Sequence, residues 1–102
     1  MQHACEMRYL VRSPFIGSYL DPNHKTGYRH VTVENGICKI VGRDRPERPE
    51  WVFEQPVKGG QLGTEMVVDF SPKGGPKDLL AKWDGRRNGI AFPDGNLWQK
   101  LS

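Results

Sequence analysis

Asp21, His24 and Asp69 have the side chains needed for acid–base chemistry. Asp21 and His24 lie three residues apart in a segment rich in turn-forming residues, and Asp69 lies within an apolar run. A carboxylate near an imidazole can orient the ring for proton transfer, although this spacing is also typical of an Asx-turn. A small enzyme with a site around these three residues is one hypothesis, and ordinary turn and strand roles are the alternative.

Aromatic residues beside acids or amides form a second set of candidates. Indole rings can stack on a planar or sugar-like ligand while a neighbouring carboxylate or amide fixes its polar groups. Trp83-Asp84 and Asn96…Trp98 have this arrangement. The candidate ligand-binding residues are Trp83, Asp84, Asn96, Trp98, Tyr19 and Asp69. Core packing is the alternative for the aromatic members, because a small protein needs large apolar side chains inside.

Other chemistries have weaker support. The loop Lys73-Gly-Gly-Pro-Lys77 lacks the Walker spacing and a following helix, which excludes nucleotide hydrolysis and leaves a flexible connection or an anion-binding loop. The histidines show no metal-ligand spacing, apart from His3 near Cys5. We therefore expect no catalytic residue, metal or cofactor, and lean away from an enzyme. No family signature is matched, so the chain is assigned to no family.

Charge and composition limit the classes of partner that the chain is expected to bind. The net charge is +3, from 15 basic and 12 acidic residues, and the densest cluster, Arg43-Asp-Arg-Pro-Glu-Arg48, is internally neutralised. Nucleic acid is therefore not expected as a partner. A solvated charged loop is the interpretation of that cluster, and a phosphate- or nucleic-acid-binding patch is the alternative. No run is long enough to span a membrane and no signal peptide is recognisable, which predicts a cytoplasmic location. Cys5 and Cys38 are expected to be buried thiols, with a single bridge as the alternative.

The elements that must position these residues are short strands. Asn-Gly and Asp-Gly dipeptides mark tight hairpins, and 12 Gly and 8 Pro separate apolar runs. Residues 79–101 are predicted as a three-stranded meander of 79–83, 89–92 and 97–101. Further strands are expected at 6–11, 15–20, 28–33, 37–41, 50–54 and 64–70, with mobile loops at 42–49 and 57–63.

These elements predict an all-β fold. We expect residues 1–102 to form one antiparallel barrel or sandwich of about seven or eight strands. The favoured function is a non-catalytic binding module that holds a small molecule, a glycan or a protein segment through its aromatic residues. A structural or accessory subunit of a larger assembly is the second hypothesis, because long polar loops are costly to order without a partner. The oligomeric state is left open.

Overall fold

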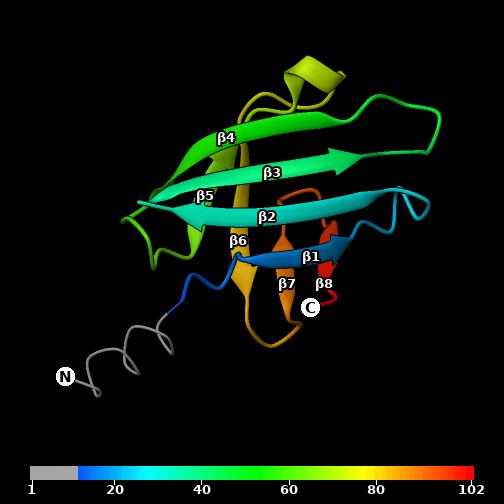
Figure 1. Ribbon diagram of the computed structural model, residues 1–102. Helices are drawn as coiled ribbons and strands as arrows, with labels where there is room; N and C mark the ends of the chain where they lie inside the picture. Colours follow the sequence, from blue (N-terminus) through cyan, green and yellow to red (C-terminus); the bar gives the residue numbers. More distant parts are fainter. Residues whose placement is uncertain (1–11) are drawn as a thin grey trace.

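Eight antiparallel strands close into a barrel in the computed structural model, which describes residues 12–102. The strands are β1 (Gly17–Leu20), β2 (Tyr28–Glu34), β3 (Ile37–Arg43), β4 (Trp51–Lys58), β5 (Glu65–Val68), β6 (Leu79–Asp84), β7 (Gly89–Ala91) and β8 (Leu97–Lys100). Each strand pairs with the next along the chain, and β8 pairs with β1 (Figure 1). The predicted all-β class is confirmed, and its form is a barrel.

The hairpin turns follow the predicted chemistry. Asn35 and Gly36 join β2 to β3 with φ angles of 51° and 77°, the positive values that a tight primed turn requires. The meander of β6, β7 and β8 is also confirmed. The expected strand at 6–11 and Cys5 lie outside the described residues.

Alternating side chains fill the barrel interior. In β2, Arg29, Val31 and Val33 are buried while the residues between them are exposed, as the alternation predicts. Eight strands leave just enough room for packed side chains inside a barrel. The buried hydrophobic residues are Phe15, Tyr19, Val31, Val33, Cys38, Ile40, Phe53, Val57, Met66, Val68, Phe70, Ala81, Ile90, Phe92 and Trp98.

Two predicted boundaries are wrong around β4. The loop expected at 42–49 starts later, because β3 continues to Arg43, and β4 runs through Pro56 to Lys58 instead of stopping before the proline. The Val57 amide donates to the Gly36 carbonyl toward β3, so the Pro56 nitrogen, one residue earlier, faces β5. Since β4 and β5 pair only at Val57–Met66 and Lys58–Glu65, the missing N–H of Pro56 costs no ladder bond.

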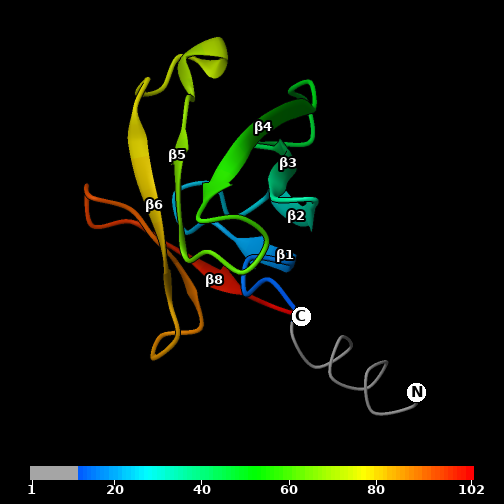
Figure 2. The same ribbon diagram turned by 90° about the vertical axis from the view of Figure 1, so that its left-hand side faces the viewer.

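The row of paired residues between β4 and β5, which we call the β4–β5 seam, is therefore short. From their connecting turn the two strands diverge toward the opposite end of the barrel, as Figure 2 shows. Aromatic side chains close the gap: Phe70, which follows β5, meets Phe53 of β4 edge-on at 5.2 Å between ring centroids. A single 3-10 turn, η1 (Ser71–Lys73), then carries the chain toward β6. This wider end of the barrel holds the features described next.

Candidate functional site

One end of the barrel collects polar side chains from loops that are distant in the sequence. In a barrel whose strands alternate in direction, the β1–β2, β3–β4, β5–β6 and β7–β8 loops all lie at the same end. A hollow of about 300 Å³ opens there, which we call the mouth hollow. It is lined by Asp21, Asn23, His24, Arg29, Asp44, Phe70, Lys73, Gly74, Gly75, Pro76, Leu79, Phe92, Asp94, Asn96 and Trp98.

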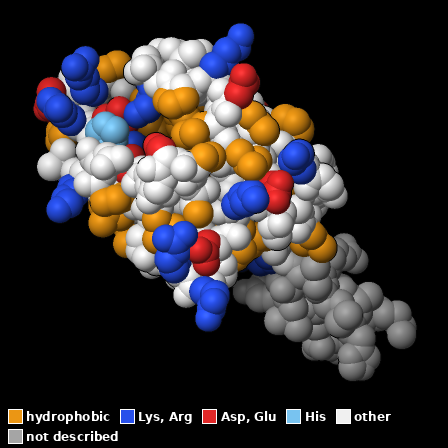
Figure 3. Space-filling view, turned by 180° about the vertical axis from the view of Figure 1, so that it is seen from behind, with side chains coloured by type: hydrophobic (Ala, Val, Ile, Leu, Met, Phe, Trp, Pro, Cys, Tyr) orange, Lys and Arg blue, Asp and Glu red, His pale blue; other side chains and the backbone are white. Residues whose placement is uncertain are grey.

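Figure 3 shows the molecule from behind. Charged side chains of both signs surround a histidine at the end away from the grey residues, with hydrophobic side chains beside them. The surface at that end is therefore mixed, with polar and apolar groups in close proximity.

Arg29 is at the centre of the polar groups. It occupies an inward position of β2 and is 1% exposed. Its guanidinium carbon lies 4.7 Å from the ring centroid of Trp51 and 5.1 Å from that of Trp98, so two indoles flank the charge. Trp51 can lie this close because Gly42 faces it across the β3–β4 pair, where a Cβ would come within 2.4 Å of the indole.

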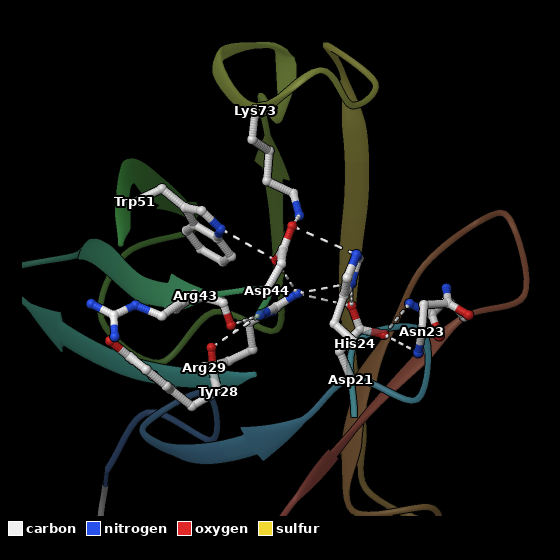
Figure 4. Close-up of polar contacts among 10 residues, drawn as sticks. Asp21, Asn23, His24, Tyr28, Arg29, Arg43, Asp44, Trp51 and Lys73 are labelled. Carbon is white, nitrogen blue, oxygen red and sulfur yellow. Dashed lines mark hydrogen bonds and ion pairs between the residues drawn. The ribbon is translucent and has the colours of Figure 1, made fainter. Parts of the chain in front are cut away.

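Two carboxylates neutralise this buried arginine. The Nη2 atom of Arg29 donates to Asp21 Oδ2 at 3.0 Å and to Asp44 Oδ1 at 2.8 Å (Figure 4). Its Nη1 atom donates to the backbone carbonyls of Tyr28 and Arg43. The Nε atom is buried without a hydrogen-bond partner among residues 12–102. Because a buried charge is costly unless paired, these contacts fix the positions of both carboxylates.

Further contacts tie the surrounding loops to the same carboxylates. His24 lies with Nδ1 3.0 Å from Asp21 Oδ2 and Nε2 3.6 Å from Asp44 Oδ2. Lys73 donates to Asp44 Oδ2 at 2.6 Å, which connects the β5–β6 loop to the β3–β4 loop. The Asn96 amide donates to Asp21 Oδ1 at 3.1 Å from the β7–β8 loop. All of the loops at the mouth therefore meet in one network.

The network keeps both carboxylates ionised. Burial alone would raise the pKa of Asp21, but hydrogen bonds with His24, Asn96 and the Asn23 amide, together with the Arg29 charge, hold that pKa below its ordinary value. Burial also opposes ionisation of Asp44. The hydrogen bond and charge of Lys73, assisted by Arg29, lower the pKa of Asp44 nonetheless.

The other wall of the mouth hollow is aromatic. Phe92 and Trp98 lie 4.9 Å apart between ring centroids, and Phe70 meets both edge-on. Each of these side chains is largely buried, and all three line the hollow. An apolar wall opposite a set of fixed polar groups is the usual design of a small-molecule pocket, and the volume is at the small end of the range for such pockets.

The predicted site residues separate into two groups. Asn96 and Trp98 line the mouth hollow, as do Asp21 and His24 from the enzyme hypothesis. The other four candidates do not line it. Tyr19 is in the core, where its hydroxyl donates to the Phe15 carbonyl at 2.8 Å.

The other three candidates, Trp83, Asp84 and Asp69, also lie outside the mouth hollow. Trp83 packs against the core and under the Lys100 ammonium, 5.2 Å from its ring centroid. Asp84 accepts from the Arg86 and Arg87 amides in the β6–β7 turn, at the opposite end of the barrel. Asp69 is exposed and accepts from the Ser71 amide, so it does not join Asp21 and His24 in one site.

Sequence reasoning missed Arg29, Asp44 and Lys73. The alternation in β2 gives a signal for Arg29, because it shares the inward face with Val31 and Val33, where an arginine needs buried partners. Asp44 lies in the cluster that was interpreted as neutralised within itself, and its partners are instead Arg29 and Lys73. No local pattern indicates that Lys73 would reach it from another loop.

Neither a metal centre nor a related protein assigns a role to this site. Within residues 12–102, no three His, Cys, Asp or Glu side chains are arranged to hold a metal ion. The same part of the chain contains no helix of the length and apolarity needed to cross a membrane. Comparisons with protein-family models, curated proteins and solved structures found no match to this chain. The site therefore has to be interpreted from its own geometry.

Proposed function

We propose that this protein is a non-catalytic binding module that holds a small polar molecule in the mouth hollow. The observation that carries the proposal is the pairing of an aromatic wall with fixed polar groups around a space of about 300 Å³. A single sugar residue or a metabolite of similar size has both an apolar face and hydrogen-bonding groups, and suits such a space. A protein segment would need a longer groove than this hollow provides.

Groups at the rim retain hydrogen-bonding capacity for a ligand. Lys73 uses one of its donors on Asp44, and Asn96 uses one amide N–H on Asp21. The backbone N–H of Asn96 donates to Asp94 Oδ1, and the other carboxylate oxygen of Asp94 accepts nothing from residues 12–102. A ligand can therefore receive hydrogen bonds from an ammonium and an amide, and donate to a carboxylate.

Catalysis is the weaker interpretation of the same residues. The carboxylates of Asp21 and Asp44 already accept several hydrogen bonds and oppose one buried guanidinium, so they are poor proton acceptors. His24 contacts both of them and lies in a network that holds side chains in place.

A protein-contact role is favoured by a different observation. Val52 and Val67 on the neighbouring strands β4 and β5 are 49% and 42% exposed. Apolar side chains on an outer strand surface are a feature of contact sites, although scattered ones are common on any surface. We therefore keep the accessory-subunit function as the second candidate, to be tested by the same experiment.

The test is a ligand screen with a variant that fills the hollow. Monosaccharides, disaccharides and small metabolites are screened by thermal shift, and positive ligands are measured by titration calorimetry. Leu79 lines the mouth hollow, so Leu79→Trp is expected to weaken binding by at least about ten-fold, a loss of 1.4 kcal/mol or more. Leu62→Trp places the same new side chain in the exposed β4–β5 loop and is expected to change nothing.

The controls separate the candidates. Circular dichroism and the melting temperature establish that Leu79→Trp is folded, and Asn96→Ala tests the hollow by removing a rim group instead of filling it. Binding that survives both changes contradicts the proposal. If no ligand binds and the chain self-associates in a way that Val52→Ser abolishes, the accessory-subunit function is favoured instead.

A further inference from the structure

We propose that a second hollow, on the outer side of the Lys73–Asp44 bridge, binds a phosphate-type oxyanion carried by a small molecule. We call it the side hollow. It has a volume of about 470 Å³ and lies between the β3–β4 and β5–β6 loops. His24, Asp44 and Lys73 line both hollows. This inference does not depend on the ligand of the mouth hollow.

A turn places two arginines on the rim of the side hollow. The Arg48 amide donates to the Arg45 carbonyl at 3.0 Å, which closes a four-residue turn with Pro46 at its second position. Proline favours this position because its ring fixes φ near the value that the turn requires. The Cα atoms at the ends of such a turn lie within about 7 Å of each other, and both arginines line the side hollow.

The two carboxylates of the side hollow contact residues other than Arg45 and Arg48. Asp44 pairs with Arg29 and Lys73, and Glu50 accepts a hydrogen bond from the Tyr28 hydroxyl. Arg45 and Arg48 form no ion pair with any residue in the range 12–102. The three basic side chains of the lining, Arg45, Arg48 and Lys73, therefore outnumber its two carboxylates, and Lys73 adds the donors that it does not use on Asp44.

The chemistry of these donors specifies the ligand class. A guanidinium presents parallel N–H donors that match the oxygens of a phosphate group, and phosphate contacts of this kind are among the stronger hydrogen bonds. The one indole ring in the lining, Trp51, already contacts Arg29, Lys73 and Phe53, at 4.7, 5.1 and 4.9 Å from its centroid. Stacking on a ring therefore contributes little here, and the anion itself is the recognised group.

The experiment uses inorganic pyrophosphate as the probe, measured by titration calorimetry against the whole chain. The variant Arg45→Ser/Arg48→Ser is expected to weaken binding at least ten-fold. The matched control Lys58→Ser/Lys82→Ser removes two exposed positive charges that lie near Glu65, away from the hollow, and is expected to stay within about two-fold of wild type. Leu79→Trp is expected to bind pyrophosphate as wild type does, so this test is independent of the mouth hollow.

Three results would overturn the inference. One is no binding of pyrophosphate at concentrations up to about 10 mM. Another is an equal loss of pyrophosphate affinity in both double variants, which would indicate that the overall positive charge of the protein alone attracts the anion. The third is a single-stranded oligonucleotide that binds more tightly than pyrophosphate and loses this binding in Arg45→Ser/Arg48→Ser, which would make nucleic acid the ligand of the side hollow. Parallel titrations with sulfate and with a nucleoside diphosphate establish whether phosphate is preferred and whether a nucleoside adds affinity.

Discussion

Arg29 shows how one buried charge can organise the loops at one end of a barrel. It is inside the barrel, yet its contacts reach Asp21 in the β1–β2 loop and Asp44 in the β3–β4 loop. Lys73 and Asn96 join the same carboxylates from the two remaining loops. The arginine is therefore a positioning residue, because the rim groups proposed to meet a ligand are held through its partners.

Removing this charge is expected to destabilise the fold strongly. Arg29→Met keeps a long apolar side chain between the two indoles but leaves Asp21 without its buried cation. Breaking one partner of a buried ion pair costs about 3 kcal/mol or more of unfolding free energy, which urea denaturation measures. Arg87→Met is the control, because it breaks an Arg–Asp contact of similar length, 2.7 Å, at the exposed β6–β7 turn. The prediction would be contradicted if Arg29→Met lowered the unfolding free energy by no more than Arg87→Met does.

How far the sequence predicts this site depends on the separation of its residues. Alternation along β2 is a local pattern, and it puts Arg29 on the same face as Val31 and Val33, although sequence reasoning did not use this signal. Its partners Asp21 and Asp44 are eight and fifteen residues away, and the Asn96–Asp21 hydrogen bond spans seventy-five. Such contacts depend on which loops share a barrel end, and that follows only once strand order and closure are known.

At the scale of elements, the hairpins were predictable and β4 was not. Asn-Gly and Asp-Gly turns carry their own backbone preferences, so the meander and the β2–β3 hairpin follow from the sequence. Pro56 indicated the end of a strand, because proline breaks a ladder between two neighbours. In this barrel the Pro56 nitrogen faces β5 at a position where β4 and β5 do not pair. The missing N–H of the proline therefore removes no hydrogen bond from the sheet.

The short seam predicts uneven hydrogen exchange. Few backbone amides are hydrogen-bonded between β4 and β5, whereas β2 and β3 pair from Tyr28 to Glu34. We therefore expect faster exchange for the amides of β5 and of the first half of β4 that point toward the β4–β5 gap than for the amides between β2 and β3. Exchange followed by NMR in deuterated buffer gives the comparison residue by residue. Equal protection on the two sides of β4 would contradict this expectation, and amides of β4 that bond to β3 serve as the internal control.

At the scale of the whole molecule, the ion-pair network predicts a loss of stability in acid. The pKa values of Asp21 and Asp44 are lower in the folded chain than in the unfolded one. Their ionised forms therefore stabilise the fold above about pH 4, and this stabilisation is lost as the pH falls through the folded values. Urea denaturation between pH 7 and pH 3 is expected to show a decline confined to the acid side.

A variant tests the source of that decline. Asp44→Asn cannot gain a proton at this position, so its stability is expected to fall less steeply with decreasing pH, although it starts from a lower value at pH 7. Asp69→Asn changes an exposed carboxylate whose pKa is also lowered, by its hydrogen bonds to Ser71, and measures the contribution from outside the network. An acid slope in Asp44→Asn identical to that of wild type would place the source elsewhere.

Because the strands alternate in direction, the chain is also suitable for attachment to a solid support by one end of the barrel. Both hollows are formed by loops at one end, and the β4–β5 turn is at the other. A Cβ added at Gly59 or Gly60 in that turn would meet no atom within 4 Å. A linker inserted between them would attach the molecule to a sensor chip or a fusion partner with the mouth hollow and the side hollow directed away from the support. Immobilisation and recognition would then use opposite poles of the same barrel.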